Sequence, residues 1–364
     1  MGWDEVTPIV EQKDIAMGSR RGATLSYIVS AASLLSSTSS CLRSRSFLIT
    51  GATDGIGRHT SQLLASDGHS LLIHGRKSSS DQNVVSLLRD LESRGAKHVS
   101  YVQADLGDLE QVFSLAEDVL AELRSWQSLS SPAVPALDCL INNAGVFDPT
   151  PRHSKQGYDM TMAVNVLAPF VLTRRLLPCL IRGEDVRIIT TSSISQSRTM
   201  PDLNSLFARK DDSGNYDYTP LPYSGHAFYS HSKLGDLLFS MKLANVLSSY
   251  QPSEDLKRQM ANNASTLENI QRIQCLTMDP GTVNTKMLLA GWGPCGISVK
   301  DANNTYKLAT SEEYAFGSRM KSGSYHFGGG PSHDAKDEIK LHALFSKLSD
   351  CTGVSYDDLS RDCF

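Results

Sequence analysis

The 364-residue sequence has few features of disulfide-bonded, zinc-binding or nucleic-acid-binding proteins. Its seven cysteines are scattered and odd in number, and none belongs to a C-x-x-C pair, which argues against a disulfide framework or a zinc site and favours a reducing compartment. The formal net charge is only -4, and no basic stripe with interleaved aromatic residues is present, so nothing indicates a nucleic-acid partner. The hydrophobic fraction of 40% is ordinary for a globular protein with a buried core.

Acidic residues are missing between Ile15 and Arg45, where two arginines, an apolar run at 23–35 and a serine cluster follow one another. This composition is typical of a targeting leader, although the acidic start of the chain is not. The apolar run is shorter than the roughly 20 residues that span a bilayer. Two interpretations of residues 1–44 stay open: an organelle-targeting or membrane-associating leader, and a plain disordered extension. We expect an intracellular protein, either cytoplasmic or organellar. If it is organellar, residues 1–44 would be a plastid, mitochondrial or ER-associated leader.

The stretch at residues 46–58, SFLITGATDGIGR, organises the rest of the chain. An apolar run at 47–50 predicts a buried strand, Gly51, Gly55 and Gly57 predict a tight turn, and the residues that follow predict a helix. A strand, a glycine turn and a helix N-terminus together bind the pyrophosphate of a dinucleotide in many proteins. A glycine pattern alone is weak support, so an ordinary glycine-rich turn is the alternative unless other parts of the chain agree.

Strand and helix patterns alternate after this stretch. We expect strands at 70–74, 98–104, 137–141, 187–193 and 273–278, with amphipathic helices at 84–91, 108–126 and 157–177 between them. This alternation predicts an α/β fold with a parallel sheet and right-handed crossovers.

Basic residues at the end of the second strand indicate which dinucleotide binds. An acidic residue there would bind the 2′-hydroxyl of NAD, whereas Arg76 suits the 2′-phosphate of NADP. Lys77 and Arg58 add cations near the same place, although an ordinary basic surface is a stronger alternative for these two than for Arg76. The sequence therefore predicts NADP(H) as the cofactor.

Several motifs resemble those of the short-chain dehydrogenase/reductase family. They are T-G-x-x-x-G-x-G at 50–57, A-D-L at 104–106, N-N-A-G at 142–145, Asn165, the serines that end the strand at 187–193, Y-x-x-x-K at 229–233 and D-P-G-T-V-N-T at 279–285. The resemblance covers roughly residues 45–350. It implies a doubly wound Rossmann fold in a single domain, with a mostly parallel seven-stranded sheet and helices on both faces. Residues 1–44 would then be an extension, and residues 351–364 a C-terminal tail.

A narrower resemblance points to the retinol dehydrogenase-like and WW-domain oxidoreductase-like branch. It rests on the long interval between Ser193 and Tyr229, the S-x-S-K-L that follows Tyr229, and a last edge strand at 322–327. The branch usually has His before the Pro-Gly pair, and this chain has Asp279 there.

The catalytic group that the resemblance implies is Asn165, Ser193, Tyr229 and Lys233. Tyr229 and Lys233 are four residues apart on a predicted helix, so they lie on one face. An adjacent ammonium favours the phenolate, so we expect Lys233 to move the pKa of Tyr229 toward the working range. In this interpretation Tyr229 exchanges a proton with the substrate oxygen, Ser193 holds that oxygen, Lys233 binds the nicotinamide ribose, and Asn165 holds a water that links Lys233 to solvent.

The resemblance also implies a set of cofactor contacts that runs along the predicted sheet edge. Besides Tyr229 and Lys233, it comprises Thr50, Gly51, Asp54, Gly55, Ile56, Gly57, Arg76, Lys77, Asp105, Leu106, Asn143, Gly145, Pro280, Gly281, Val283 and Thr285. No spacing of His, Cys or carboxylate residues suggests a metal site, and we expect His226 and His231 to be solvated helix positions.

The leading hypothesis is an NADP(H)-dependent oxidoreductase that interconverts a carbonyl and an alcohol. Apolar residues at 287–289 and Trp292, after the Pro-Gly loop, favour a lipophilic substrate such as a retinoid, steroid or lipid aldehyde, although they could simply pack a lid helix. One alternative is a regulatory or interaction protein that binds a dinucleotide with little catalysis. Another is an epimerase or dehydratase with bound NAD, which the glycine spacing and Arg76 disfavour.

Overall fold

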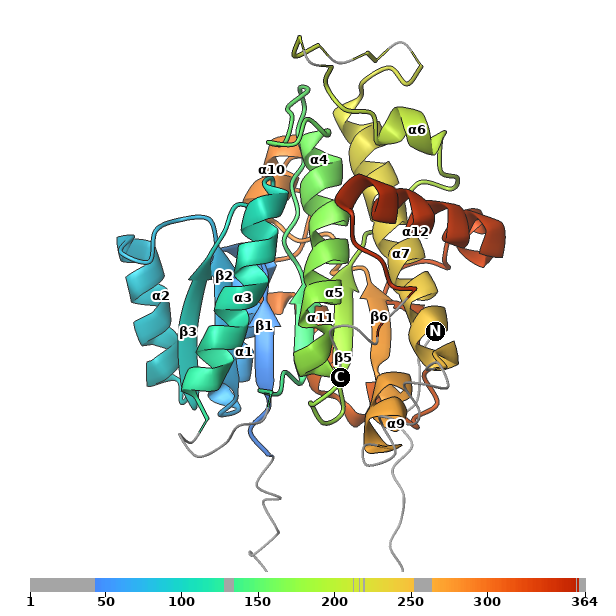
Figure 1. Ribbon diagram of the computed structural model, residues 1–364. Helices are drawn as coiled ribbons and strands as arrows, with labels where there is room; N and C mark the ends of the chain where they lie inside the picture. Colours follow the sequence, from blue (N-terminus) through green and yellow to red (C-terminus); the bar gives the residue numbers. More distant parts are fainter. Residues whose placement is uncertain are drawn as a thin grey trace, which may run out of the picture. The chain divides into compact units, whose positions relative to one another are not determined.

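The described residues form one seven-stranded sheet in a computed structural model (Figure 1). The structure describes residues 43–127, 134–251 except 212, 216 and 219, and 264–359 except 358. Of the extension predicted over residues 1–44, only the last two residues fall within these ranges. Ser44–Phe364 is one compact unit. The predicted single α/β domain is therefore described almost from its first residue.

The sheet has the order β3-β2-β1-β4-β5-β6-β7, and each neighbouring pair is parallel. Its strands are β1 (Ser46–Ile49), β2 (Ser70–Gly75), β3 (His98–Gln103), β4 (Cys139–Asn142), β5 (Arg187–Thr191), β6 (Gln274–Met278) and β7 (Ser324–His326). The five central strands are buried on both faces, which explains their nearly continuous apolar sequences. The predicted strands are confirmed to within a few residues.

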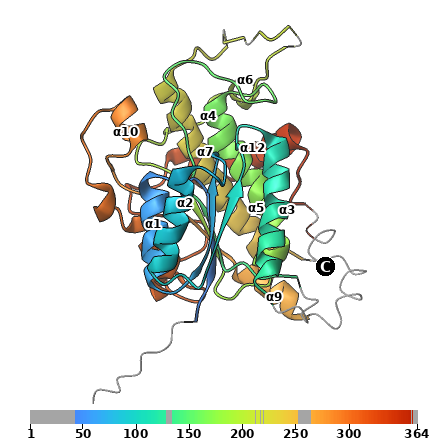
Figure 2. The ribbon, with the colours of Figure 1, turned by 90° about the vertical axis from the view of Figure 1, so that its left-hand side faces the viewer.

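Helices cover both faces of the sheet, as Figure 2 shows for α1 and α2 on one side and α3 and α5 on the other. The first face carries α1 (Gly55–Ser66), α2 (Gln82–Ser93) and α11 (Asn304–Thr310); the second carries α3 (Leu109–Ser125), α5 (Ala168–Leu180) and α7 (Gly225–Ser249). Each layer buries its own apolar cluster against the sheet. This is the doubly wound Rossmann arrangement that the motifs predict.

The remaining described helical elements connect or flank these layers. They are α4 (Met160–Met162), the π-helical turn η2 (Ala163–Leu167), α6 (Leu203–Leu206), α9 (Ala264–Arg272), α10 (Lys286–Gly291), η4 (Val299–Asp301), η5 (Glu312–Tyr314), η6 (His333–Lys336) and α12 (Glu338–Thr352).

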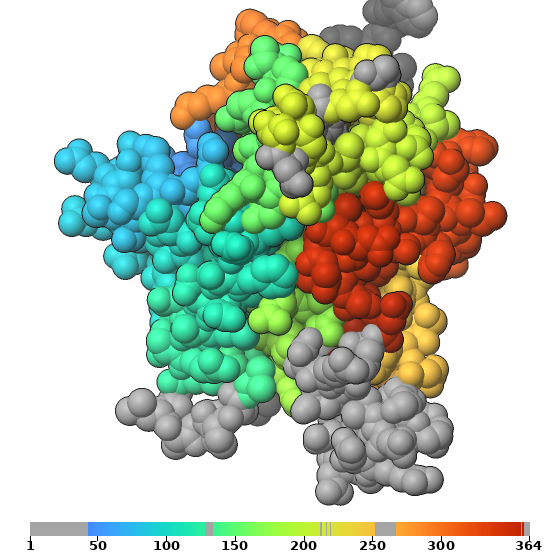
Figure 3. All heavy atoms as spheres, turned by 45° about the horizontal axis from the view of Figure 1, so that its top comes forward, coloured from blue at the N-terminus to red at the C-terminus, as the bar shows by residue number. Residues whose placement is uncertain are grey.

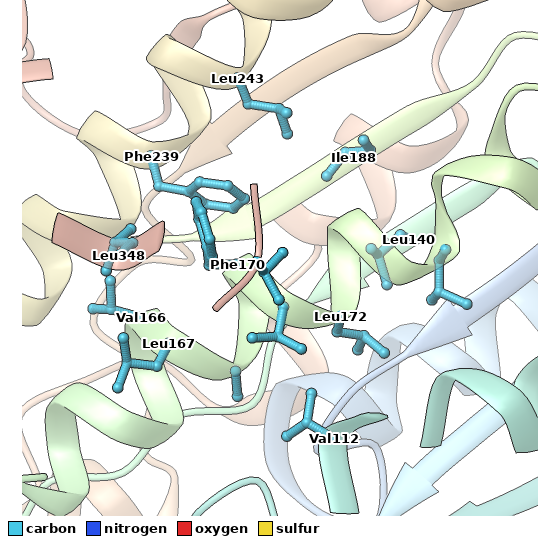
Figure 4. Close-up of a cluster of buried hydrophobic side chains, with 14 of the residues drawn as sticks. Val112, Leu140, Val166, Leu167, Phe170, Leu172, Ile188, Phe239, Leu243 and Leu348 are labelled. Atoms are coloured by element: carbon cyan, nitrogen blue, oxygen red, sulfur yellow. The ribbon is translucent and has the colours of Figure 1, made fainter. Parts of the chain in front are cut away.

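The helix predicted over 157–177 runs from 160 to 180, through α4, η2 and α5. It begins after Asp159, whose Oδ1 accepts hydrogen bonds from the backbone N–H groups of Thr161 and Met162. Among the described residues, Met160–Leu180 is the one helical segment long and apolar enough to cross a membrane, but 89% of its apolar window is buried inside the protein. It is the central helix of the core, and Figure 4 shows Phe170 pointing toward Phe239 within that core.

The segment after residue 350, which the sequence assigns to a C-terminal tail, packs against the core. Tyr356 is buried and its Oη donates to the carbonyl of Phe170 at 2.8 Å. Leu359 is fully buried. The helix before this segment, α12, is red in Figure 3 and lies beside the yellow-green region of α6, where Lys347 Nζ donates to Asn204 Oδ1 at 2.8 Å. The folded domain therefore extends at least to residue 359.

Candidate active site

A cavity of about 620 Å³ lies at the carboxyl ends of the strands. The strand order reverses between β1 and β4, and the loops after these two strands both line the cavity. Ligands of open α/β sheets bind at this switch point. The cavity collects most of the predicted site: Gly51, Asp54, Gly55, Ile56, Arg76, Asp105, Leu106, Asn143, Gly145, Ser193, Tyr229, Lys233, Pro280, Gly281, Val283 and Thr285.

The glycine loop needs its glycines for conformation and for close packing. Gly51 has a φ of 63°, and a Cβ there would lie 2.9 Å from the Cα of Ala144. A Cβ on Gly57 would lie 2.6 Å from Asn143 Nδ2. The loop leads into α1, whose first residues, Gly55 and Ile56, line the cavity. The N–H groups of a first helical turn have no partner within the helix, so this position suits a phosphate.

Thr50 and Gly57 do not line the cavity. Thr50 instead stabilises the glycine loop through hydrogen bonds. Thr50 Oγ1 accepts hydrogen bonds from the N–H groups of Asn143 and Ala144, both at 3.0 Å. Asn143 Nδ2 donates to the carbonyl of Thr50 at 2.9 Å. These bonds join the loop after β1 to the loop after β4. The predicted direct contacts of Thr50 and Gly57 with the cofactor stay a prediction.

Arg76 and Lys77 point to different surroundings. Arg76 is exposed and lines the cavity next to Asp105 and Leu106. Lys77 is absent from the cavity wall, and its Nζ pairs with Asp81 at 2.9 Å. Arg76 is therefore the better placed of the two for a ligand phosphate. Lys77 pairs with Asp81, the residue that caps the start of α2, and its predicted contact with the cofactor stays a prediction.

His74 is a cavity residue that the sequence analysis missed. Its Nδ1 accepts from the N–H of Gly51 at 3.2 Å, and its Nε2 lies 3.1 Å from the carbonyl of Ala104. Because a carbonyl only accepts, the proton is on Nε2. Burial lowers the pKa of His74 to about 4, so the ring is neutral and ties the glycine loop to β2 and to the end of β3. A histidine ending an otherwise apolar strand was the available signal.

Tyr229, Ser193 and Lys233 meet at the other end of the cavity. A hydrogen bond from Ser193 favours the Tyr229 phenolate, and Ser193 Oγ also lies 2.9 Å from Ser195 Oγ. Lys233 Nζ lies 5.6 Å from the centre of the Tyr229 ring. The residue types and their proximity give a hydroxyl, a phenol and an ammonium around one point. Such a group can polarise and protonate a carbonyl oxygen.

The ionisation of Tyr229 differs from the expectation. Burial raises the pKa of Tyr229, and the lowering effect of the Lys233 ammonium does not offset it. Lys233 acts in the expected direction, because its ammonium lowers the pKa of Tyr229, but burial raises that pKa by more. Lys233 itself is buried, and its Nζ donates to Asp236 Oδ2 and to the carbonyl of Thr191, both at 2.8 Å. Asp236 is a second residue that the sequence analysis missed.

Asn165 lies in the π-helical turn η2 and behind the cavity wall. Its Oδ1 accepts from the N–H of Val146 at 2.8 Å, and its Nδ2 donates to Ser232 Oγ at 2.9 Å. The side chain therefore ties the loop after β4 to α7, the helix of Tyr229. A π-helical turn often marks a functional position. The predicted water bridge to Lys233 stays a prediction.

Aromatic and apolar side chains surround the outer side of Tyr229. The rings of Phe147 and Trp292 lie 4.8 Å apart, and Trp292 lies 5.4 Å from Tyr229. His226 is exposed on α7, as expected, and its ring also packs against Phe147 and Trp292, each at 5.0 Å. In Figure 3 the orange region of α10 lies next to the green segment after β4. Ile194, which also lines the cavity, is 64% exposed.

His231, in contrast, is half-buried, and burial lowers its pKa, so the expectation of a solvated position does not hold for this residue. Among the residues that the structure describes, no group of three or more His, Cys, Asp or Glu side chains could hold a metal ion.

Comparison with known proteins agrees with the fold and the motifs. A family model described as short chain dehydrogenase matches residues 45–207. An uncharacterized oxidoreductase of Schizosaccharomyces pombe is 30% identical over 290 residues, which cover 73% of this chain and 77% of the yeast protein. The chain belongs to the short-chain dehydrogenase/reductase family. This confirms the family predicted from the motifs.

Two further relatives show how far the similarity reaches. Polyprenol dehydrogenase of Mus musculus is 30% identical over 250 residues, or 67% of this chain; the chain spans only 62% of the length of that relative. A short chain dehydrogenase from Shigella flexneri 2a, solved in complex with NADP, has a TM-score of 0.51 and 20% identity; the match covers 77% of this chain and 95% of that one. The similarity to the Shigella structure shows that the two proteins share a fold.

Proposed function

We propose that this family member is an NADP(H)-dependent oxidoreductase that interconverts a carbonyl and an alcohol, with Tyr229 as the acid and base. The observation that carries the proposal is the meeting of Tyr229, Ser193 and Lys233 in one cavity with the glycine loop. One end of that cavity has the residue types that proton exchange needs, and the other end has a turn of the kind that binds phosphate, which supports the proposal. A regulatory protein that only binds the dinucleotide would need the phosphate-binding turn but not the group for proton exchange.

The cavity suits an extended NADP(H) molecule. The first turn of α1 offers backbone N–H groups for the pyrophosphate, although the N–H of Gly55 donates to Asp54 Oδ1 at 2.9 Å. The exposed guanidinium of Arg76 suits the 2′-phosphate. At the other end, Lys233 uses two of its three N–H donors in the described contacts, which leaves one for a ribose hydroxyl. The NADP in the Shigella relative supports the same cofactor here. When bound, the nicotinamide supplies or accepts the hydride.

The side chains divide the remaining work. Ser193 donates a hydrogen bond to the substrate oxygen and holds it beside Tyr229. In reduction, Tyr229 gives its phenolic proton to that oxygen, and in oxidation it takes the proton back. Lys233 stabilises the phenolate that forms when the proton leaves.

The substrate is lipophilic in this proposal. Phe147, Trp292 and Ile194 place an apolar rim at the Tyr229 end of the cavity, and Leu289 on α10 is 47% exposed. Exposed apolar side chains of this kind are typical of a surface that receives an apolar ligand. The mouse relative is named for a polyprenol, a long apolar alcohol, which supports a retinoid, steroid or lipid carbonyl for this chain.

The test is a panel of carbonyls and alcohols assayed by nicotinamide absorbance, with NADP(H) and NAD(H) in parallel. We expect turnover of lipophilic members with NADP(H) and much weaker turnover with NAD(H). Tight NADPH binding without turnover of any substrate would favour the regulatory alternative. Preference for NAD(H) would contradict the cofactor assignment and reopen the epimerase or dehydratase alternative.

A further inference from the structure

Lys233 is held by a buried carboxylate from its own helix. Asp236 lies one turn further along α7, and its Oδ2 is 2.8 Å from Lys233 Nζ. Both side chains are almost fully buried, with 5% and 2% of their surface exposed. The spacing 229, 233, 236 places Tyr229, Lys233 and Asp236 along one face of the helix.

Within the described ranges, the Asp236 side chain makes no hydrogen bond besides the one with Lys233. Among the described residues, its second oxygen, Oδ1, is buried and has no partner. Burying a carboxylate costs several kcal/mol unless it is paired and hydrogen-bonded, and an apolar residue of similar size often stabilises a fold more. The position is therefore poorly explained by packing alone. Its single charged partner is the lysine of the proton-exchange group.

Three charged side chains act on the ionisation of Tyr229. Lys233 and Asp236 act on it from α7, and Asp279 acts from the end of β6. Burial and the two aspartates favour the neutral phenol, whereas Lys233 and Ser193 favour the phenolate. Burial raises the pKa of Asp236 to about 7, so in the alkaline range where Tyr229 titrates Asp236 is charged and neutralises Lys233. Ionisation of Tyr229 would then leave the buried group with a net negative charge.

We propose that Asp236 is the buried counter-ion of Lys233 and acts through it to hold Tyr229 as the protonated, proton-donating phenol. Asp236 is thus a positioning residue. It keeps the ammonium charged and in place, and it weakens the attraction of that ammonium for a phenolate. The inference rests on the proposed function in one respect: with Tyr229 as the acid, the resting site is prepared for carbonyl reduction rather than alcohol oxidation.

The test is a titration of Tyr229 in the ligand-free protein. With 13C at the ζ carbon of tyrosine, NMR follows each phenol, and the signal missing from Tyr229→Phe identifies Tyr229. Asp236→Asn keeps the shape and removes the charge, so we expect the Tyr229 midpoint to fall by at least about one pH unit. The matched control is Asp159→Asn, another buried carboxylate, which caps α4 and does not contact Lys233. It should leave the midpoint unchanged. An unmoved or higher midpoint in Asp236→Asn would overturn the proposal.

A second measurement covers the case in which Asp236→Asn does not fold. Lys233→Met leaves Asp236 buried and unpaired, so its melting temperature at pH 8.5 should fall, and adding Asp236→Asn should restore most of the loss. No restoration in the double variant would contradict the pairing. Neither measurement uses turnover. If no carbonyl is turned over, the proposed function fails, but the role of Asp236 as counter-ion of Lys233 does not. If carbonyls are turned over and the Tyr229 midpoint is unmoved in Asp236→Asn, only the role of Asp236 fails.

Discussion

At the scale of single residues, the cavity depends on side chains whose neighbours set their chemistry. Arg76 and Lys77 are adjacent in sequence, yet Arg76 lines the cavity and Lys77 pairs with Asp81. His74 is neutral because it is buried between two backbone partners. In both cases the surroundings, rather than the residue type, decide what the side chain can bind.

Substitution of Arg76 should separate the two cofactors. We expect Arg76→Ala to weaken NADPH binding roughly 10- to 100-fold, since a hydrogen bond to a charged group contributes about 1.5–3 kcal/mol. NADH, which has no 2′-phosphate, should bind unchanged. Fluorescence titration of both cofactors measures this. Lys77→Ala is the matched control and should change neither affinity; equal losses in both variants would contradict the assignment.

The pH dependence of folding should carry the signature of His74. The pKa of His74 in the folded protein, about 4, lies below its ordinary value of 6.5. Between pH 4 and pH 6.5, His74 is therefore protonated in the unfolded chain and neutral in the folded protein. Its contribution to stability is full above pH 6.5 and is lost as the pH falls to 4, by about 3 kcal/mol in all. His74→Gln keeps a donor and an acceptor without titrating, so its free energy of unfolding in urea should fall less between pH 7 and 4.5.

The exposed His342 provides the control for this comparison, because His342→Gln should follow the wild-type curve. Parallel loss of stability in the wild type and in His74→Gln would show that the buried ring is not the titrating group.

At the scale of elements, the loop between β1 and α1 works because two glycines let it touch the loop after β4. Gly51 meets Ala144, and Gly57 meets Asn143. The π-helical turn η2 adds Asn165, whose amide joins that second loop to α7. The phosphate end and the proton-exchange end of the cavity are therefore parts of one hydrogen-bonded frame.

A methyl group at residue 51 should disturb this frame. Gly51→Ala combines a φ of 63° with a Cβ only 2.9 Å from a backbone atom, so we expect a loss of about 1–3 kcal/mol in stability. NADPH affinity should fall as well. Thermal melting and cofactor titration measure both. Gly329→Ala has no heavy atom within 4 Å of the added Cβ and should behave as wild type. Normal cofactor binding by Gly51→Ala would argue against the loop as the phosphate site.

The elements were largely predictable from sequence, and so was the proton-exchange group. Strands such as β1 and β4 are buried on both faces and consist mostly of apolar residues. The Y-x-x-x-K motif places Tyr229 and Lys233 on one face of a helix. The partners of these residues were not predictable. The Lys233–Asp236 pair looks like an ordinary surface pair until its burial is known, because helical spacing does not report depth. The contact of Phe147 with Trp292 joins loops that are distant in sequence.

At the scale of the whole molecule, the C-terminal segment completes the core. Phe170 contacts Phe345 and Tyr356. The carbonyl of Ser355 accepts a hydrogen bond from Arg174 Nε at 2.8 Å. A sequence that turns polar after residue 350 hides this role, since only Tyr356 and a few apolar residues mark it. The reducing, intracellular environment suggested by the scattered cysteines stays a prediction.

Removal of the Tyr356 ring should therefore destabilise the entire domain. We expect Tyr356→Ala to cost about 3–5 kcal/mol, the usual loss for a large buried aromatic residue. Asp357→Ala, at an exposed neighbouring position, should stay within about 0.5 kcal/mol of wild type. Denaturant unfolding compares the two. Equal stability of both variants would show that the segment after residue 350 is dispensable.

The most direct test of the proposed reaction is Tyr229→Phe, assayed on the best substrate of the carbonyl panel. Loss of the phenolic proton should lower turnover by roughly 10²–10⁴-fold or more, while NADPH binding survives because the ring and Lys233 remain. Tyr314→Phe, a buried phenol outside the cavity, is the control and should retain full activity. Turnover by Tyr229→Phe at the wild-type rate would contradict the account.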